Sequence, residues 1–176
     1  GSAYSEVTDQ SNMTDTQGWW NCIVSGDFDS DGDLDLVVGN LGLNSKYKAT
    51  LESPFKVFAS DFDSSGTNDI VLGYYEKGNL FPVRGRQCSS EQMPFIKEEY
   101  ATYDAFARAS LPEVIGESRI VKAVEKSAHT FSTTYFENKG DGIFEGKALP
   151  APAQITSVND VVVDDVKGDR NLDLIL

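Results

Sequence analysis

Five aspartates at alternate positions form the part of the chain whose residue types and spacing most directly predict chemistry. The run is Asp27-Phe28-Asp29-Ser30-Asp31-Gly32-Asp33-Leu34-Asp35. Carboxylates this close together repel one another unless a cation lies among them, and Ca²⁺ takes six to eight oxygen ligands at roughly 2.3–2.6 Å. A short loop supplies such ligands from side chains at positions 1, 3, 5 and 9 and from the carbonyl group of position 7. We therefore predict a calcium site made by Asp27, Asp29, Asp31, the carbonyl group of Asp33, and Asp35.

A second copy of this loop follows 34 residues later, as Asp61-Phe62-Asp63-Ser64-Ser65-Gly66-Thr67-Asn68-Asp69. Glycine at position 6, Gly32 or Gly66, adopts a positive φ at little steric cost and so permits a sharp turn. The predicted ligands of the second calcium site are Asp61, Asp63, Ser65, Thr67 and Asp69. Since it has fewer carboxylates, this site is expected to bind more weakly than the first. The alternative for either loop is a solvated acidic turn without an ion.

A third, degenerate copy is Asp165-Val166-Lys167-Gly168-Asp169-Arg170-Asn171-Leu172-Asp173. Its candidate ligands for a weaker metal site are Asp165, Asp169, Asn171 and Asp173. Position 3 is Lys167, whose ammonium group could neutralise the neighbouring carboxylates in place of a metal ion. We favour a loop closed by ion pairs here, with calcium binding as the alternative.

The residues after each loop exclude an ordinary EF-hand. That motif needs a bidentate Glu at position 12 and flanking helices, whereas position 12 is Val38 in the first loop and Leu72 in the second. Short apolar runs rich in β-branched residues follow instead, and these are typical of buried strands. Each loop therefore leads into a β-strand.

The segment between the second and third loops is expected to contain both helices and strands. Residues 98–111 carry apolar side chains at helical spacing, and residues 113–127 could form a second helix interrupted at Gly116. We expect a helical insertion over 98–127. Thr130 to Glu137 then alternates as a strand, and the Asn and Gly residues of 138–142 favour a tight hairpin before the strand resumes at Ile143.

Loops of the DxDxDGxxD type with apolar strands, together with the hairpin at 138–144, resemble the FG-GAP or VCBS repeat of β-propellers. Integrin α-subunit heads and many bacterial surface proteins contain such repeats. Three segments resemble, more narrowly, a bacterial branch of this family that is related to cartilage acidic protein and associated with ASPIC/UnbV domains. They are Gly18-Trp19-Trp20-Asn21, Gly26-Asp27-Phe28-Asp29 and the run from Val38 to Asn44. The resemblance implies four-stranded blades in which calcium has a structural role, with ligand binding coupled to folding.

This resemblance predicts an all-β fold, a partial β-propeller of antiparallel FG-GAP/VCBS blades with a helical insertion. The predicted parts are a polar N-terminal segment (1–17), two repeats with calcium loops (18–97), the insertion (98–127) and a further, truncated repeat (128–176). Propellers use about four to eight blades, so we expect a piece of a longer propeller that begins with a cloning remnant, Gly1-Ser2. A small self-contained β domain is the alternative. An incomplete propeller would leave an open sheet edge through which copies could oligomerise.

Composition limits the classes of partner. The net charge of −13 argues against nucleic acid, whose phosphates require a basic patch, and no apolar run is long enough to span a membrane. Two calcium ions would change −13 only to −9. Because weak calcium sites are filled reliably outside the cytosol, we expect an extracytoplasmic protein, secreted, periplasmic or on the cell surface, that binds a protein or polysaccharide ligand.

Residue types give little support for catalysis. His129 is the sole histidine, and no Ser-His-Asp or Cys-His grouping can be built around it. We expect no enzymatic activity; the alternative is a fragment of a carbohydrate-active propeller enzyme, a glycosidase or polysaccharide lyase. Cys22 and Cys88 could form one disulfide or remain free thiols. A set of aromatic and cationic side chains could belong to a glycan- or protein-binding surface, or could simply be core and rim residues: Arg84-Gly85-Arg86, Tyr74, Tyr75, Phe81 and Trp19-Trp20.

Overall fold

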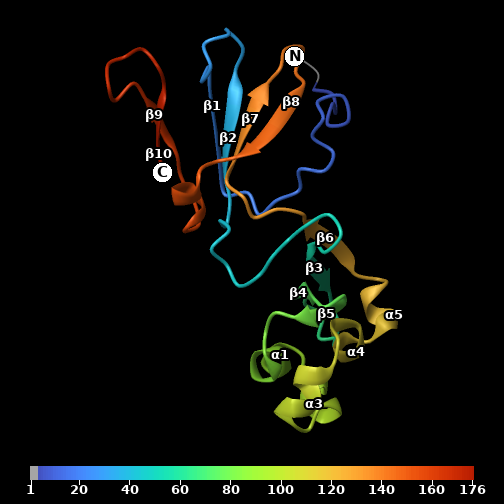
Figure 1. Cartoon of the computed structure of the whole chain (residues 1–176). Coiled ribbons are helices and arrows are strands. Elements are labelled where there is room, and N and C mark those ends of the chain that lie inside the picture. Colours follow the sequence, from blue (N-terminus) through green and yellow to red (C-terminus); the bar gives the residue numbers. More distant parts are fainter. Residues whose placement is uncertain (1–3) are drawn as a thin grey trace. The chain divides into compact units, whose positions relative to one another are not determined.

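The chain forms two compact units, shown in the computed structural model of Figure 1. The structure describes residues 4–176, so Gly1 and Ser2, the suggested cloning remnant, lie outside the described residues. Unit 1 comprises the chain up to Lys46 and the part from His129 to Leu176, and unit 2 comprises Tyr47–Ala128. Unit 2 is thus an insertion in the sequence of unit 1.

Unit 1 contains a four-stranded antiparallel sheet of order β1-β2-β7-β8. Its strands are β1 (Cys22–Gly26), β2 (Asp35–Gly39), β7 (Thr134–Asn138) and β8 (Phe144–Ala148). The two central strands, β2 and β7, are far apart in sequence but pair with each other, so that Leu36 lies opposite Phe136. A two-stranded antiparallel hairpin, β9 (Val162–Asp164) and β10 (Asp173–Ile175), follows a 3₁₀ turn at Ala151–Gln154.

The core of unit 1 lies between the sheet and this hairpin. Val37, Val158 and Val161 are buried, and side chains from β1, β7, β9 and β10 pack around them. At the other end of the sheet, buried amide side chains tie the chain leaving β2 to the chain returning to β7. Asn40 donates to the carbonyl groups of Thr130 and Ser132, and Gln154 bonds both backbone groups of Thr133. The Asn40 bonds join the two segments of unit 1 that flank the inserted unit, and the Gln154 bonds join the 3₁₀ turn to the residue before β7.

Unit 2 contains a second four-stranded antiparallel sheet, of order β5-β4-β3-β6. The strands are β3 (Phe55–Ser60), β4 (Asp69–Glu76), β5 (Asn79–Pro82) and β6 (Val124–Ala128). The turn between β4 and β5 has positive φ at Lys77 and Gly78, the geometry of the two-residue hairpin turn that matches strand twist.

Five short helices connect β5 to β6: α1 (Arg86–Gln92), α2 (Phe95–Glu99), α3 (Tyr103–Arg108), α4 (Leu111–Ile115) and α5 (Glu117–Ile120). Their apolar side chains cover one face of the sheet, and Leu111, Ile96 and Ile115 are buried against Phe58 and Val71. Such short helices have little stability of their own, so packing against the sheet must hold them. None of the helices in residues 4–176 is long and apolar enough to cross a membrane.

The structure bears out the coarse fold class and corrects its details. Residues 4–176 are mostly antiparallel β-sheet with a few helices; their sheets are not closed into a ring, and the propeller stays a prediction. The helices run from Arg86 to Ile120 rather than over 98–127, and Val124–Ala128 is a strand because it pairs with β3. The predicted parts 18–97 and 128–176 also differ from the two units, since β7 and β8 return to the sheet of β1 and β2.

Truncation of the central side chain of the unit 2 core should destabilise that unit. Leu111 is fully buried and its Cδ1 atom lies close over Gly73 of β4, so Leu111→Ala is expected to lower the free energy of unfolding by about 2–5 kcal/mol. Hydrogen exchange of the amides of β3 and β4 measures this. Val121→Ala changes a side chain that is 84% exposed, so it should change the free energy of unfolding obtained from exchange by less than about 0.5 kcal/mol. Equal protection in both variants would contradict the proposed core.

Candidate metal centres

Loop 1, residues 27–35, connects β1 to β2, as the sequence predicts. One carboxylate oxygen from each of Asp27, Asp29 and Asp31 lies within 4.8 Å of the others. The backbone has positive φ at Ser30 (64°) and Gly32 (97°). These two left-handed residues turn the chain so that the three carboxylates converge on one side of the loop. The donor set, all carboxylate oxygen, fits a hard divalent ion such as calcium.

Loop 2, residues 61–69, connects β3 to β4 and repeats this geometry in unit 2. Positive φ occurs at the same two positions, Ser64 (62°) and Gly66 (89°). The carboxylates that lie within 4.8 Å of one another are those of Asp61, Asp63 and Asp69. The hydroxyl groups of Ser65 and Thr67 are 2.9 Å apart. They place two further oxygens on this loop at positions where loop 1 has carboxylates.

Loop 3, residues 165–173, connects β9 to β10 and has the same backbone form. Its positive φ values again fall at positions 4 and 6, which are Gly168 and Arg170, both at 72°. Position 6 thus needs the left-handed conformation even where glycine is absent. An arginine there carries strain that Gly32 and Gly66 avoid.

One hydrogen-bond pattern is common to the three loops. The first aspartate accepts from the backbone N–H groups of positions 5 and 6, one on each carboxylate oxygen. The N···O distances are 3.1 and 3.2 Å for Asp27, 2.9 and 2.9 Å for Asp61, and 3.0 and 2.9 Å for Asp165. The three loops are therefore copies of one structure, although their sequences have diverged.

The position 9 aspartates differ between the loops. Asp35 is completely buried and accepts hydrogen bonds from the N–H groups of Phe28 (3.1 Å) and Asn138 (2.8 Å) and from the hydroxyl of Tyr135 (2.8 Å). Burial and this hydrogen bond to a carboxylate raise the pKa of Tyr135. Asp69 accepts from Phe62 N–H at 3.1 Å and also belongs to the loop 2 cluster. Asp35 instead fastens loop 1 to β7, and the loop 1 cluster lacks it.

Position 3 distinguishes loop 3 from the others. The ammonium group of Lys167 forms an ion pair with Asp173, the position 9 carboxylate. The hydrogen bond and the opposite charge raise the pKa of Lys167, and the hydrogen bond lowers the pKa of Asp173. Loop 3 is thus closed by an internal cation, as the sequence suggested. In residues 4–176 its acids do not form a group like those of loops 1 and 2.

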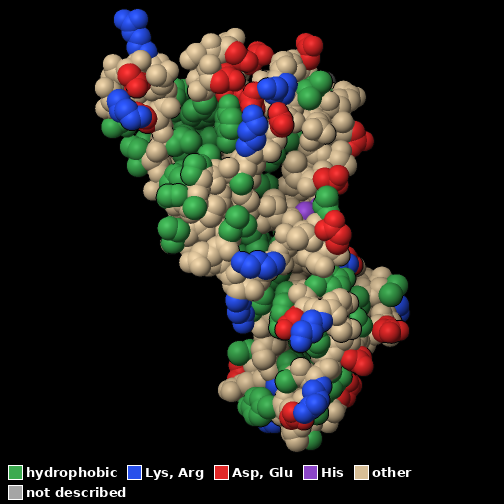
Figure 2. Space-filling view, in the orientation of Figure 1, with side chains coloured by type: hydrophobic (Ala, Val, Ile, Leu, Met, Phe, Trp, Pro, Cys, Tyr) green, Lys and Arg blue, Asp and Glu red, His purple; other side chains and the backbone are tan. Residues whose placement is uncertain are grey.

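Negative charge is concentrated in unit 1. This unit carries 16 Asp and Glu against 5 Lys and Arg, a net charge of −11, whereas unit 2 carries 12 against 10, a net charge of −2. Figure 2 shows acidic side chains gathered at the loop 1 end of the sheet. Burial, followed by the charge of Asp31, raises the pKa of Asp29. Nearby, Glu137 pairs with Lys139 and Lys147, whose hydrogen bonds lower its pKa.

Sequence reasoning missed the partners that hold loop 1 in place. Tyr135 and Asn138 lie about 100 residues from Asp35, in a strand that the sequence assigned to a different repeat. The hairpin at 138–144 was predicted, but nothing in the sequence indicated that its first residue reaches back to the first loop. The structure also holds Cys22 and Cys88 as free thiols, one in each unit.

Comparisons with protein-family models, with curated proteins and with solved structures each give no match. The similarity of the three loops to one another is therefore argued only from the structure and sequence of this chain.

Removal of the Asp35 carboxylate should destabilise unit 1 even without metal. Asp35→Ala leaves the Phe28 and Asn138 amides and the Tyr135 hydroxyl without their acceptor, so we expect a loss of about 3 kcal/mol or more. Urea unfolding in excess chelator measures it. Asp33→Ala, an exposed acid in the same loop, serves as the control and should change stability by less than about 0.5 kcal/mol. Similar losses in both variants would argue against the role given to Asp35.

Replacement of the internal cation should turn loop 3 into a metal site. Lys167→Asp restores an acid at position 3 and removes the ion pair to Asp173, so this variant is expected to bind one more calcium ion than the parent protein. Ion-binding stoichiometry from calorimetry checks this. Lys122→Asp makes the same charge change in unit 2 and should leave the stoichiometry unaltered. An unchanged ion count for Lys167→Asp would show that loop 3 lacks the donor geometry of the other loops.

Proposed function

We propose that this chain is a calcium-binding FG-GAP/VCBS-type module in which loops 1 and 2 each hold one structural calcium ion. The observation that carries the proposal is the common geometry of the loops. Each has left-handed residues at positions 4 and 6 and a first aspartate fixed by two backbone amides. In loops 1 and 2 three carboxylates converge as well, which is costly without a cation.

A structural role for calcium follows from where the loops lie. Loops 1 and 2 each join two antiparallel strands of a four-stranded sheet, and each is bounded directly by the strand ends. An ion among their carboxylates would remove the repulsion between acids that the hairpin brings together. Binding would therefore favour the paired strands over the unfolded chain, stabilising the fold by about 2.7 kcal/mol at a calcium concentration 100 times the dissociation constant.

The loop arrangement also supports the assignment to a propeller. Strands β1-β2-β7-β8 form a four-stranded antiparallel sheet, the arrangement expected of a blade. Loop 1 joins its first two strands, and loop 3 joins the two strands that follow it in the chain. We therefore propose that β1, β2, β7 and β8 make one blade, that unit 2 is inserted between its second and third strands, and that β9 and β10 begin the next blade.

The proposed cellular role is interaction with a protein or polysaccharide outside the cytoplasm. Two features support it. Calcium sites of micromolar to millimolar affinity are filled reliably in extracellular fluids, and the acidic surface of unit 1, at −11, is unsuited to nucleic acid. The chain itself would perform no chemistry. Turnover of a glycan by the protein would instead favour the alternative, a part of a carbohydrate-active enzyme.

Calorimetric titration of chelator-stripped protein with Ca²⁺, together with thermal melting, tests the metal assignment. We expect two ions to bind and the melting temperature to rise. Asp29→Ala removes one of the three converging carboxylates of loop 1, so it should weaken one site and spare the other. Asp63→Ala should do the same for loop 2.

The matched control is Asp141→Ala, which removes an acid from the β7–β8 turn, outside all three loops. It should retain both ions with parental affinity. No binding to the parent protein, or unchanged stoichiometry and affinity in Asp29→Ala, would refute the calcium sites.

A further inference from the structure

Unit 2 contains a cavity of about 210 Å³ at the edge where β5 leads into the helices. Its lining residues are Tyr74, Phe81, Pro82, Val83, Arg84, Gly85, Phe106, Ala107 and Ala109. Three of these nine residues are aromatic and one is a cation, and none is an acid. This lining favours a ligand with a flat apolar face and a negative group.

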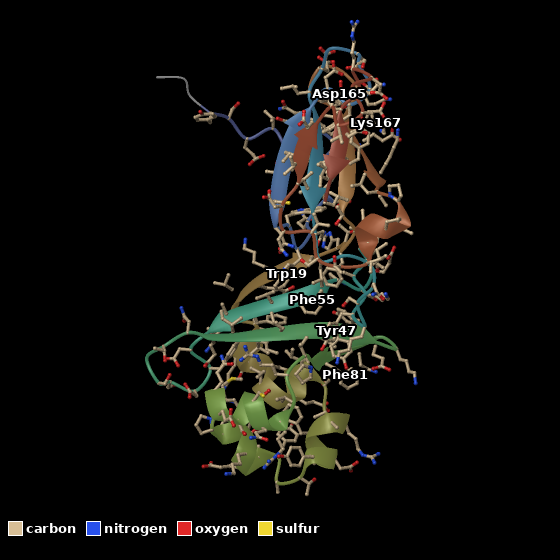
Figure 3. The ribbon with its side chains drawn as sticks, turned by 90° about the vertical axis from the view of Figure 1, so that its left-hand side faces the viewer. Trp19, Tyr47, Phe55, Phe81, Asp165 and Lys167 are labelled. Atoms are coloured by element: carbon tan, nitrogen blue, oxygen red, sulfur yellow. The ribbon has the colours of Figure 1, made fainter. Side chains whose placement is uncertain are left out.

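The aromatic wall is held rigidly. Tyr74 and Phe81 are directly opposite each other on β4 and β5, with ring centroids 6.4 Å apart. Tyr74 also packs against Tyr47 at 5.0 Å, and Figure 3 shows Tyr47 and Phe81 at the same end of the unit 2 sheet. Phe106, from α3, is buried and contributes the third ring. Rings fixed in this way offer contact area at little entropic cost on binding.

The cation is positioned but not neutralised. Arg84 is exposed, and its Nη1 atom donates to Oε1 of Gln92 on α1 at 3.1 Å. Within residues 4–176 Arg84 takes part in none of the ion pairs. A guanidinium group has five N–H donors, so one hydrogen bond to a neutral amide orients it and leaves the capacity to bind a carboxylate in bidentate fashion.

Arg86, two residues further on, has a different role. It donates to the carbonyl groups of Tyr100 and Lys97 and its guanidinium lies 5.3 Å from the ring centroid of Tyr103. These contacts tie α1 to α2 and α3. Arg86 therefore supports the helical layer, whereas Arg84 is the one charged side chain that lines the cavity.

We propose that this cavity binds a single uronate residue of an acidic polysaccharide, with its carboxylate on Arg84 and its ring against Tyr74 and Phe81. The volume is below the roughly 300–1,000 Å³ of sites for drug-sized ligands, which limits the occupant to about one ring. A uronate has one face of C–H groups for the aromatic wall, while its hydroxyl groups remain in water at the open mouth. This inference names a ligand class for the proposed function and rests on it.

The test is a ¹H–¹⁵N NMR titration of the calcium-saturated protein with glucuronate. We expect saturable shifts of the amides of Phe81, of residues 83–85 and of residues 106–109. Glucose, which lacks the carboxylate, and acetate, which lacks the ring, should each bind at least tenfold more weakly. The assignment to a uronate would be overturned by any of three results: shifts that do not saturate, shifts confined to other parts of the chain, or benzoate binding as tight as glucuronate binding.

Variants assign the contacts. Arg84→Gln should weaken glucuronate binding at least tenfold because it removes the charge of an exposed side chain. Phe81→Leu should weaken binding as well, since it removes the ring but keeps a half-buried apolar side chain at this position. Arg108→Gln, an exposed arginine on α3 that pairs with Asp104, should bind within twofold of the parent protein. Equal affinity of Arg84→Gln and Arg108→Gln would overturn the proposal. Calcium stoichiometry measured on the same samples separates failure of this site from failure of the metal sites.

Discussion

Two backbone amide groups that donate to one aspartate are the interaction on which the acidic loops depend. Asp27, Asp61 and Asp165 each accept from positions 5 and 6 of their loop. These bonds turn the loop tightly, bring the strands on either side into register, and place the remaining acids close together. The repulsion among those acids is then a consequence of the turn. In loop 3 the ammonium group of Lys167 relieves it, and in the proposed function an ion does so in loops 1 and 2. The loops therefore share a backbone and differ in how they balance charge.

The local features could be predicted from the sequence because local interactions determine them. Alternating acids and a glycine at position 6 indicated the turn of loops 1 and 2, apolar runs indicated strands, and Lys167 at position 3 indicated an internal ion pair. The Asn and Gly residues at 138–142 indicated a hairpin, and β7 ends and β8 begins on either side of it. The helices were placed too late in the chain, since α1 and α2 have weak helical patterns and are held mainly by packing on the sheet. The metal assignment itself stays a prediction.

Strand partners could not be predicted, because pairing between distant strands leaves no pattern in a single sequence. The order of repeats suggested that each acidic loop belongs to a contiguous blade. Instead β2 pairs with β7 across the whole of unit 2, and β6 crosses back to β3. For the same reason the burial of Asp35 was missed. Its alternating spacing made it a fifth ligand, but Tyr135 and Asn138 take its carboxylate into the sheet. A residue that looked equivalent to its neighbours in sequence has a separate structural role.

The position of unit 2 within unit 1 has a consequence for the order of folding. Leu36 and Phe136 must meet in the sheet of unit 1, and closing an unstructured loop of that length carries an entropic cost that grows with the logarithm of its length. If unit 2 has already collapsed, β3 and β6 hold its ends side by side, and the loop to be closed shortens to the connecting residues 40–54 and 129–133. The hydrogen bonds from Asn40 to Thr130 and Ser132 then join the two connecting segments. An insertion that folds first would thus lower the entropic cost of forming the sheet that surrounds it in the sequence, and a lesion in the core of unit 2 would then slow the assembly of unit 1.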